Sequence, residues 1–338
     1  MSYNKAKGAK IGHKIGEIAS CQICAPLAIS CTCLGLNSTL QILNDHQLVQ
    51  ASLWNPFLFN FSFAYNLYLW HFLRMKDQIR LIDYIQNLRK KGQYLFLKEE
   101  AGQALGLTNT AILNSIHRLS KKNKVAHLKK GLYQIITEEY ANDGSLPPEW
   151  FINDLMTHLQ TPYYVGLLTA ASLHGSSHHA PQIFQVVCGK VIPSLTVGSI
   201  KIVFYYSTDM ATIPTQKIKV PSGYMIVSTP EGTAFDLMRY LHQSGHLNHV
   251  STVLSELSAV IDAHRIAQVG NQLSVRYGQR LGYILDTLGF ETLTRPLHKI
   301  VSKKSPPYIP LRSDVDNEII EKNQKWHIRV NETLETDV

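Results

Sequence analysis

The fold of the first folded segment is decided by residues 94–136, YLFLKEEAGQALGLTNTAILNSIHRLSKKNKVAHLKKGLYQII. The pattern predicts a short helix over Lys98–Leu105, a tight turn, a second helix and a basic β-hairpin. Gly106 can end the first helix with a positive φ, and the side chain of Thr108 or Asn109 can cap the second. This order of elements is that of a winged helix-turn-helix, a module that commonly places its second helix in DNA.

The second predicted helix has one apolar and one polar face. Ile112, Ile116 and Leu119 recur at i, i+4 and i+7 and form a single stripe that can be buried. The other face and the hairpin tip carry side chains that can reach base edges or phosphates in a major groove. The residues predicted to contact DNA are Thr108, Asn109, Thr110, Asn114, His117, Arg118, Lys121, Lys122, Lys129 and Lys130.

Positive charge is concentrated in the same segment. The 338-residue chain holds 33 Lys and Arg against 25 Asp and Glu, a net charge of +8. Residues 75–140 alone hold 12 against 6, a net charge of +6. Such a local excess is typical of a phosphate-binding surface, so DNA binding is our first hypothesis. In the alternative reading, the winged helix mediates only protein contacts and its lysines serve solubility.

The first 74 residues have an anomalous composition. Four of the five cysteines, Cys21, Cys24, Cys31 and Cys33, fall within this part. No Asp, Glu, Lys or Arg occurs from His46 to Leu73, and nine aromatic residues crowd the stretch 54–72. An ordinary soluble pattern follows at once from Met75.

Three readings of this leader stay open. Residues 53–73 have about the length of a membrane span, although they include several polar side chains. Cys21 and Cys24 could form one zinc knuckle, but Cys31 and Cys33 are too close in sequence for the usual second pair. The composition change favours the third reading, in which the natural protein starts at Met75. We expect a cytoplasmic protein in which Cys188 is a free thiol.

The rest of the chain predicts a second domain. Residues 138–148 are polar and contain Gly144 and two prolines, so we divide the chain into 1–74, 75–145 and 146–338. Thr229 is expected to cap a helix that begins at Pro230. Strands are expected over 182–188, 200–206, 223–228 and 326–330, and further helices over 150–159, 167–174, 250–261, 263–269 and 274–288. The predicted class is α+β, a winged helix-turn-helix followed by a small mixed sheet backed by helices.

Four segments in this order carry a resemblance to a known family. The winged helix is followed by YYVGLLTAASLHG with HHAPQ (163–182), VSTPEGTAFDLM (227–238) and WHIRVN (326–331). Together they resemble the AbiEi antitoxins of type IV toxin-antitoxin systems, over roughly Met75 to Asn331. One departure is visible, because the family commonly has Arg after the glutamate and this chain has Gly232.

The resemblance implies a function for each part. Such proteins bind inverted repeats in the promoter of their own operon through the winged helix. Inverted repeats would need two winged helices, from a homodimer or from two monomers on the DNA. Their carboxy-terminal domain opposes a nucleotidyltransferase-like toxin, with which direct contact is not required. By position, the antitoxin-domain signature would be Tyr163, Tyr164, Gly166, His174, Gly175, Pro181, Pro230, Glu231 and Asp236.

We expect no enzymatic activity, metal or cofactor. His174, His178 and His179 with Glu231 or Asp236 could form a metal site, but we favour the interpretation in which His174 and Gly175 simply end a helix. Residues 175–177 faintly resemble the glycine-serine motif of nucleotidyltransferases. That chemistry needs acidic residues nearby to hold magnesium, and no Asp or Glu occurs between Gly175 and Ser207. A winged helix fused to a nucleotide-binding or metal-dependent enzyme, and a membrane-tethered regulator, remain the alternative hypotheses.

Overall fold

The computed structural model describes residues 80–176, 182–315 and 318–334, all within one compact unit, Leu67–Val338. The predicted membrane span, the four clustered cysteines and the predicted start at Met75 lie outside the described residues. Among the residues described, no helix is long and apolar enough to cross a membrane.

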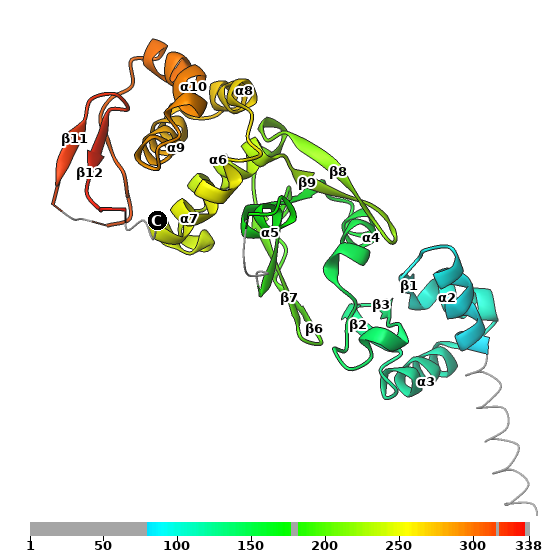
Figure 1. Ribbon diagram of the computed structural model, residues 1–338. Coiled ribbons are helices and arrows are strands. Elements are labelled where there is room, and N and C mark those ends of the chain that lie inside the picture. Colours follow the sequence, from blue (N-terminus) through cyan, green and yellow to red (C-terminus); the bar gives the residue numbers. More distant parts are fainter. Residues whose placement is uncertain (1–79, 177–181, 316–317, 335–338) are drawn as a thin grey trace, which may run out of the picture. The chain divides into compact units, whose positions relative to one another are not determined.

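The first described segment has the elements of a winged helix-turn-helix (Figure 1). Residues 80–90 are helical and are followed by β1 (Leu95–Leu97), α2 (Lys98–Leu105), α3 (Asn109–Ser120), β2 (Val125–Lys129) and β3 (Leu132–Ile135). Both β1 and β2 pair antiparallel with β3, so the strand order is β1-β3-β2. Gly106 ends α2 with φ of 63°, and the Thr108 hydroxyl accepts a hydrogen bond from the Ala111 amide at 3.3 Å. The predicted turn and cap are confirmed.

The apolar stripe of α3 builds the core of this segment. Ile112, Ile116 and Leu119 are buried and pack in one cluster with residues of the first helix and the small sheet, including Leu81 and Phe96. Burying one face of α3 fixes which side chains remain outside, because residues 3 or 4 apart share a face.

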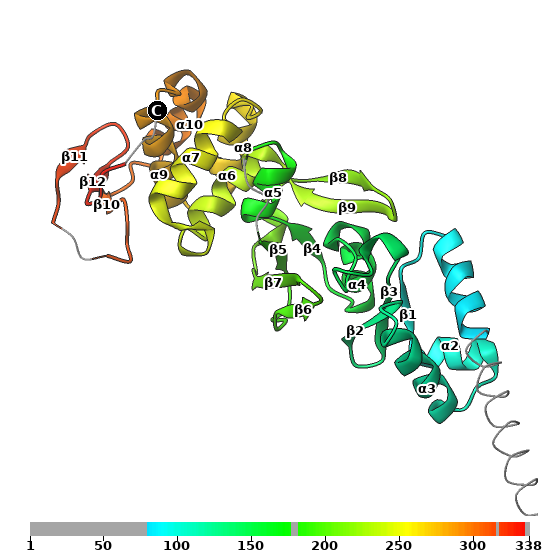
Figure 2. The same cartoon turned by 60° about the horizontal axis from the view of Figure 1, so that its bottom comes forward.

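A six-stranded mixed sheet forms the centre of the following segment. Its strands are β4 (Tyr163–Val165), β5 (Ile183–Cys188), β6 (Leu195–Val197), β7 (Ile200–Tyr206), β8 (Thr215–Val220) and β9 (Gly223–Ser228). The strand order is β6-β7-β5-β4-β9-β8, with β5 parallel to β7 and β4 parallel to β9. Strand β8 lies at one edge, where Figure 2 shows it with β9 as a two-stranded ribbon.

Both faces of this sheet are covered, which explains the three consecutive buried residues of β4. Tyr163 and Val165 belong to the cluster on one face, together with residues of α4 (Ile152–His158) and with Leu128 and Leu132 of the hairpin. Tyr164 points to the other face, into a cluster with α5 (Leu167–Leu173) and α6 (Pro230–Arg239). Because successive side chains of a strand alternate, Tyr164 lies on the opposite face of the sheet from Tyr163 and Val165.

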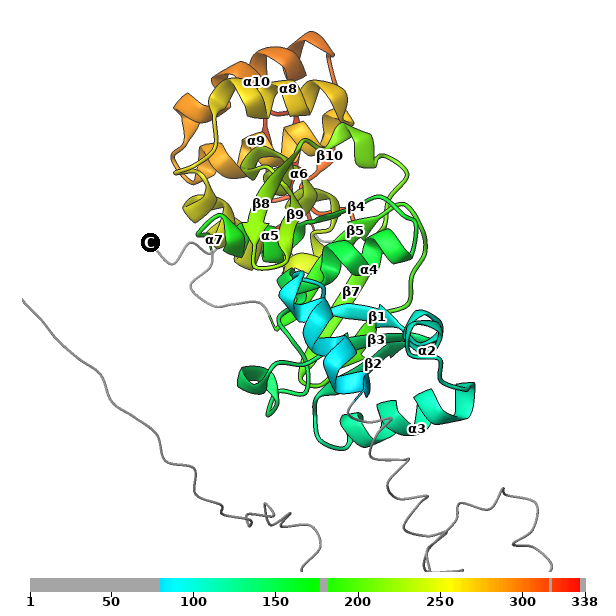
Figure 3. The same cartoon turned by 90° about the vertical axis from the view of Figure 1, so that its right-hand side faces the viewer.

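Further helices and a small sheet complete the chain. The helices are α7 (His246–Leu257), α8 (Ala263–Gln272), α9 (Val275–Thr287) and α10 (Glu291–Lys303), and α8 lies beside α10 (Figure 3). Strands β10 (Ile309–Pro310), β11 (Glu321–Asn323) and β12 (Ile328–Val330) form the three-stranded sheet. The indole of Trp326 packs on Gly282 of α9, where a Cβ would overlap the ring. The predicted α+β class is confirmed, with several elements added.

Two helix predictions need correction, and several elements were not predicted. Helix α7 begins at His246 and ends at Leu257, four residues earlier than predicted at each end, because Gly245 turns the chain with φ of 87°. Helix α4 begins at Ile152 rather than Trp150, after a 3₁₀ turn over Pro148–Trp150. Helix α10 was not predicted, and neither were the short strands β1, β4, β6, β8, β10 and β11.

Candidate functional site

Nearly all of the predicted DNA-contacting side chains are exposed, on α3 or on the turn and hairpin that follow it. Thr108 caps α3, and its neighbours lead onto the face of that helix opposite the buried stripe. Exposed members of the set are Thr108, Asn109, Thr110, Asn114, His117, Lys121, Lys122, Lys129 and Lys130. The structure thus leaves the polar side chains of α3 and the lysines that follow it in the chain exposed to solvent.

Arg118 is the exception, because it is half-buried and bonded along its own helix. Its Nε donates to the carbonyl of Asn114 at 3.1 Å, and its Nη2 donates to the hydroxyl of Ser115 at 3.1 Å. The guanidinium would have to give up these bonds to reach a base. Asn114, which is exposed, needs no such rearrangement.

The hairpin between β2 and β3 carries two lysines at its tip. Lys129 and Lys130 are exposed, and Gly131 completes the turn with φ of 77°. The amide of Lys98 donates to the Gly131 carbonyl at 2.8 Å, which ties the tip to the start of α2. The Glu99 carboxylate also lies beside Gly131, so the local charge at the tip is not purely positive.

In the second segment, three of the predicted signature residues meet in the interior. Tyr164 of β4, Gly166 and Asp236 of α6 are all buried. A Cβ at Gly166 would lie 3.1 Å from the Tyr164 ring and 3.4 Å from Asp236 Oδ2, so only glycine leaves these two groups their present spacing. The motif residues therefore pack against one another across sheet and helix.

Asp236 supplies the carboxyl of this cluster, and its pKa is shifted. Burial raises the pKa of Asp236 to about 7, although Arg239 and Tyr164 both favour the ionised form. Its oxygens and the Tyr164 hydroxyl have no hydrogen-bond partner of good geometry among the described residues. Burial and the nearby Asp236 in turn raise the pKa of Tyr164, which stays a neutral phenol.

Arg239 also belongs to this cluster, although it is not among the predicted signature residues. Its Nη1 lies 3.6 Å from Asp236 Oδ1, one helical turn away, and its Nη2 donates to the Ser207 hydroxyl at 3.2 Å. The i, i+3 spacing on a predicted helix could have indicated the pairing. The signal was weak because Asp236 was expected only as a motif residue and not as a buried one.

His174 and Gly175 end helix α5, as predicted. His174 is its C-cap residue, and Gly175 follows with φ of 83°. The Nε2 of His174 lies 2.7 Å from the carbonyl of Ser228, which connects the helix end to β9. His178, His179 and Pro181 lie outside the described residues.

The start of α6 is held by a helix cap and by a hydrogen bond to the start of α8. Thr229 accepts a hydrogen bond from the Gly232 amide at 3.2 Å, which confirms the predicted cap, and Pro230 opens the helix. Glu231 is buried, and its Oε1 accepts from the Asp262 amide at 3.0 Å, so it joins α6 to the start of α8. A Cβ at Gly232 would lie 2.9 Å from Ile213, which leaves no room for the arginine common in the family.

Tyr163, the remaining signature residue, has a structural bond of its own. Its hydroxyl donates to Asn153 Oδ1 at 3.1 Å, and burial raises the pKa of Tyr163 to about 12. Together with the contacts above, the described signature residues lie in the interior or at helix ends. Their arrangement stabilises the packing of sheet on helices and presents no open set of groups to a substrate.

Comparison with known proteins agrees with the motifs. Residues 164–287 match the family model of the AbiEi antitoxin C-terminal domain, which confirms the predicted resemblance to AbiEi antitoxins for that part of the chain. No curated protein sequence matches the chain significantly.

Among solved structures, that of the RV2827C protein from Mycobacterium tuberculosis has a fold similar to that of this chain. It has a TM-score of 0.51 and 14% sequence identity, and the match covers 73% of this chain and 89% of that one. At this identity the similarity concerns the fold alone.

Proposed function

We propose that this chain is a DNA-binding antitoxin of a type IV toxin-antitoxin system. The observation that carries the antitoxin role is the match of residues 164–287 to the AbiEi antitoxin domain. The polar face of α3 and the lysines at the hairpin tip support DNA binding. The protein would act in the cytoplasm, where its own operator and a nucleotidyltransferase-like toxin would be encountered.

In this proposal, residues 75–145 bind DNA and α3 enters the major groove. Thr110 and Asn114 would contact base edges, because Asn can bond adenine through two atoms. Lys129 and Lys130 would contact phosphates from the hairpin. An operator of inverted repeats needs one α3 per half-site, supplied by a dimer or by two monomers on the DNA.

Residues 146–338 would supply the antitoxin activity without a chemical reaction. The buried cluster of Tyr164, Gly166 and Asp236 supports this, because groups enclosed in the core can hold the domain but cannot reach a substrate. The surface that opposes the toxin would then be formed by residues outside the signature. Nothing in the proposal requires the two proteins to form a stable complex.

Two assays in cells separate the two halves of the proposal. A reporter driven by the DNA upstream of the gene should be repressed by the wild-type chain and released by the Lys129→Ala, Lys130→Ala double variant. In the second assay, the neighbouring toxin is expressed, and both the wild-type chain and the double variant should restore growth. An unrepressed reporter would contradict the DNA-binding role, and a failure of both proteins to restore growth would contradict the antitoxin role.

A further inference from the structure

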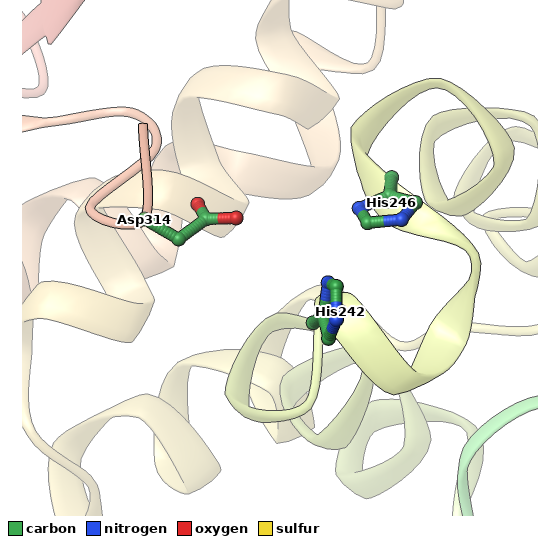
Figure 4. Close-up of side chains that lie close together, drawn as sticks. All are labelled: His242, His246 and Asp314. Atoms are coloured by element: carbon green, nitrogen blue, oxygen red, sulfur yellow. The ribbon is translucent and has the colours of Figure 1, made fainter. Parts of the chain in front are cut away.

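Two histidines and an aspartate meet at the surface where α7 begins (Figure 4). They are His242, His246 and Asp314, and one ligand atom from each lies within 4.8 Å of the other two. All three residues are exposed. None belongs to the motifs or to the predicted DNA-binding face.

The backbone explains why the two imidazoles are close. His242 lies in the 3₁₀ turn His242–Ser244, and Gly245 and His246 follow with φ of 87° and 67°. The resulting bend sets the two rings edge to face with centroids 4.7 Å apart. Neither imidazole has a hydrogen-bond partner among the described residues, so its nitrogens can accept another ligand.

Asp314 comes from the loop after β10 and is held in place by Arg312. The Nε of Arg312 donates to Asp314 Oδ1 at 3.0 Å, and its Nη2 bonds the other carboxylate oxygen. A carboxylate has about four lone-pair positions, so a bidentate arginine leaves two for a further ligand. Carboxylates that bind metals are commonly oriented by such hydrogen bonds.

The charge around the three side chains does not exclude a cation. Arg312 is balanced by two carboxylates, because its Nη1 also bonds Glu332 Oε2 at 2.8 Å. Arg239 and Arg280 line an adjacent cavity of about 230 Å³, together with His242 and Asp314. Arg239 is occupied by Asp236 and Ser207, and Arg280 donates to the Pro310 carbonyl at 3.1 Å.

We propose that His242, His246 and Asp314 bind a divalent transition metal of the zinc class, with water as a fourth ligand. Two imidazoles and one carboxylate with an open position suit Zn²⁺, and imidazole ligands disfavour Mg²⁺ and Ca²⁺. Zinc bonds of about 2.0–2.2 Å bring tetrahedral ligand atoms to about 3.4 Å from one another. Exposed side chains can close the remaining gap by small rotamer changes.

A metal in this position would connect two parts of the chain. His242 and His246 flank the start of α7, whereas Asp314 and its partner Arg312 belong to the segment that leads from β10. Binding to the native state alone stabilises it, so the metal would strengthen the attachment of the carboxy-terminal sheet. This inference does not depend on the proposed function.

The test is zinc binding by the full-length protein, measured in competition with a chromophoric chelator. The wild type should bind one more equivalent of Zn²⁺ than the His242→Ala, His246→Ala double variant. Asp314→Asn should weaken that equivalent about tenfold or more. The amino-terminal cysteines are the same in every variant, so their binding cancels in the comparison.

His264→Ala is the matched control, because His264 is an exposed histidine on α8. It should bind zinc like the wild type, and zinc should raise the Tm of both but not that of the double variant. If the alanine double variant unfolds, His242→Gln replaces it in the comparison, because glutamine has a similar size and polarity. It should also bind one equivalent of Zn²⁺ less than the wild type. Equal zinc stoichiometry in the wild type, the His242→Ala, His246→Ala double variant and His242→Gln would overturn the proposal.

Discussion

The guanidinium of Arg239 lies 3.6 Å from the fully buried carboxyl of Asp236, one turn earlier on α6. Burial still dominates the titration of this carboxyl, because it raises the pKa of Asp236 to about 7 against the opposing effect of Arg239. The unfolded chain would release the same proton near pH 4. Native protein therefore holds a proton between these two values that the unfolded chain has lost.

From this difference we predict a pH-dependent stability. The contribution of protonated Asp236 is complete below about pH 4 and is lost as the pH rises through the folded pKa near 7. We expect urea unfolding to show that the free energy of unfolding falls from pH 5 to pH 8 in the wild type. This fall should be larger, by on the order of a few kcal/mol, than the fall in Asp236→Asn, whose side chain cannot ionise. Parallel pH profiles of the two proteins would show that Asp236 titrates normally.

The helix cap at Thr229 gives a second prediction. Thr229→Ala removes the acceptor for the Gly232 amide and should lower the free energy of unfolding by about 1 kcal/mol. Thr229→Ser keeps the hydroxyl and should recover most of the loss. A loss of the same size in the serine variant would assign the effect to the methyl group instead of the cap.

Packing of Trp326 on α9 gives a third prediction. Gly282→Ala introduces a methyl group into the space of the indole ring and should destabilise the fold by about 1–3 kcal/mol. Trp326→Phe makes room at this contact, so the double variant should lose less than the sum of the two single losses. Additive losses in chemical denaturation would mean that the two residues do not interact.

For the reading face of α3, we predict a change in sequence preference. Asn114→Ala should reduce the preference for operator over unrelated DNA by about 1–3 kcal/mol if Asn114 reads a base. Arg118→Ala should do the same only if the guanidinium leaves the Asn114 carbonyl and the Ser115 hydroxyl on binding. Unchanged preference in both variants, measured by competition binding, would move the reading face elsewhere.

The hairpin lysines should act differently from the reading face. Lys129→Ala and Lys130→Ala should weaken binding to all DNA sequences alike, because phosphates carry no sequence information. Each lost contact should reduce the slope of log K against log salt concentration by about 0.9. Lys217→Ala, which alters an exposed lysine of β8, serves as the control and should leave the slope unchanged. Slopes of all three variants equal to that of the wild type would remove the hairpin from the interface.

Local signals in the sequence were sufficient to predict helices α2 and α3, the turn between them and the hairpin that follows. Gly106, Thr108 and the stripe of Ile112, Ile116 and Leu119 act within one or two turns of helix, so their effect could be predicted without tertiary information. Similar reasoning placed β7, β9 and the start of α6. The elements that were missed depend on partners distant in the chain.

Strand β4 shows why such elements escaped prediction. Tyr163–Val165 is only three residues long and runs directly into α5, so its identity as a strand comes from pairing with β5 and β9. Helix α10 contains Pro296, which favours a break when only the local sequence is considered. In both cases tertiary contacts override the local preference.

The residues of the candidate sites, too, could be predicted only where a local sequence pattern determines their position. Side chains on one helix face, such as Asn114 and His117, could be predicted from periodicity alone. The spacing of Asp236 and Arg239 was visible, but the burial that raises the pKa of Asp236 follows from the packing of α6 on the sheet. The approach of Asp314 to His242 depends on where the loop after β10 lies, which no local pattern indicates.

The most direct test of the central claim is fluorescence anisotropy of the purified protein on labelled DNA from upstream of its own gene. Scrambled DNA of the same composition is the control, and both are titrated across a salt series. The account predicts site-preferring binding that persists near physiological salt and is weakened in Asn114→Ala by about 1–3 kcal/mol. Equal, weak binding to both DNAs, or none, would contradict it and leave the winged helix as a protein-contact module.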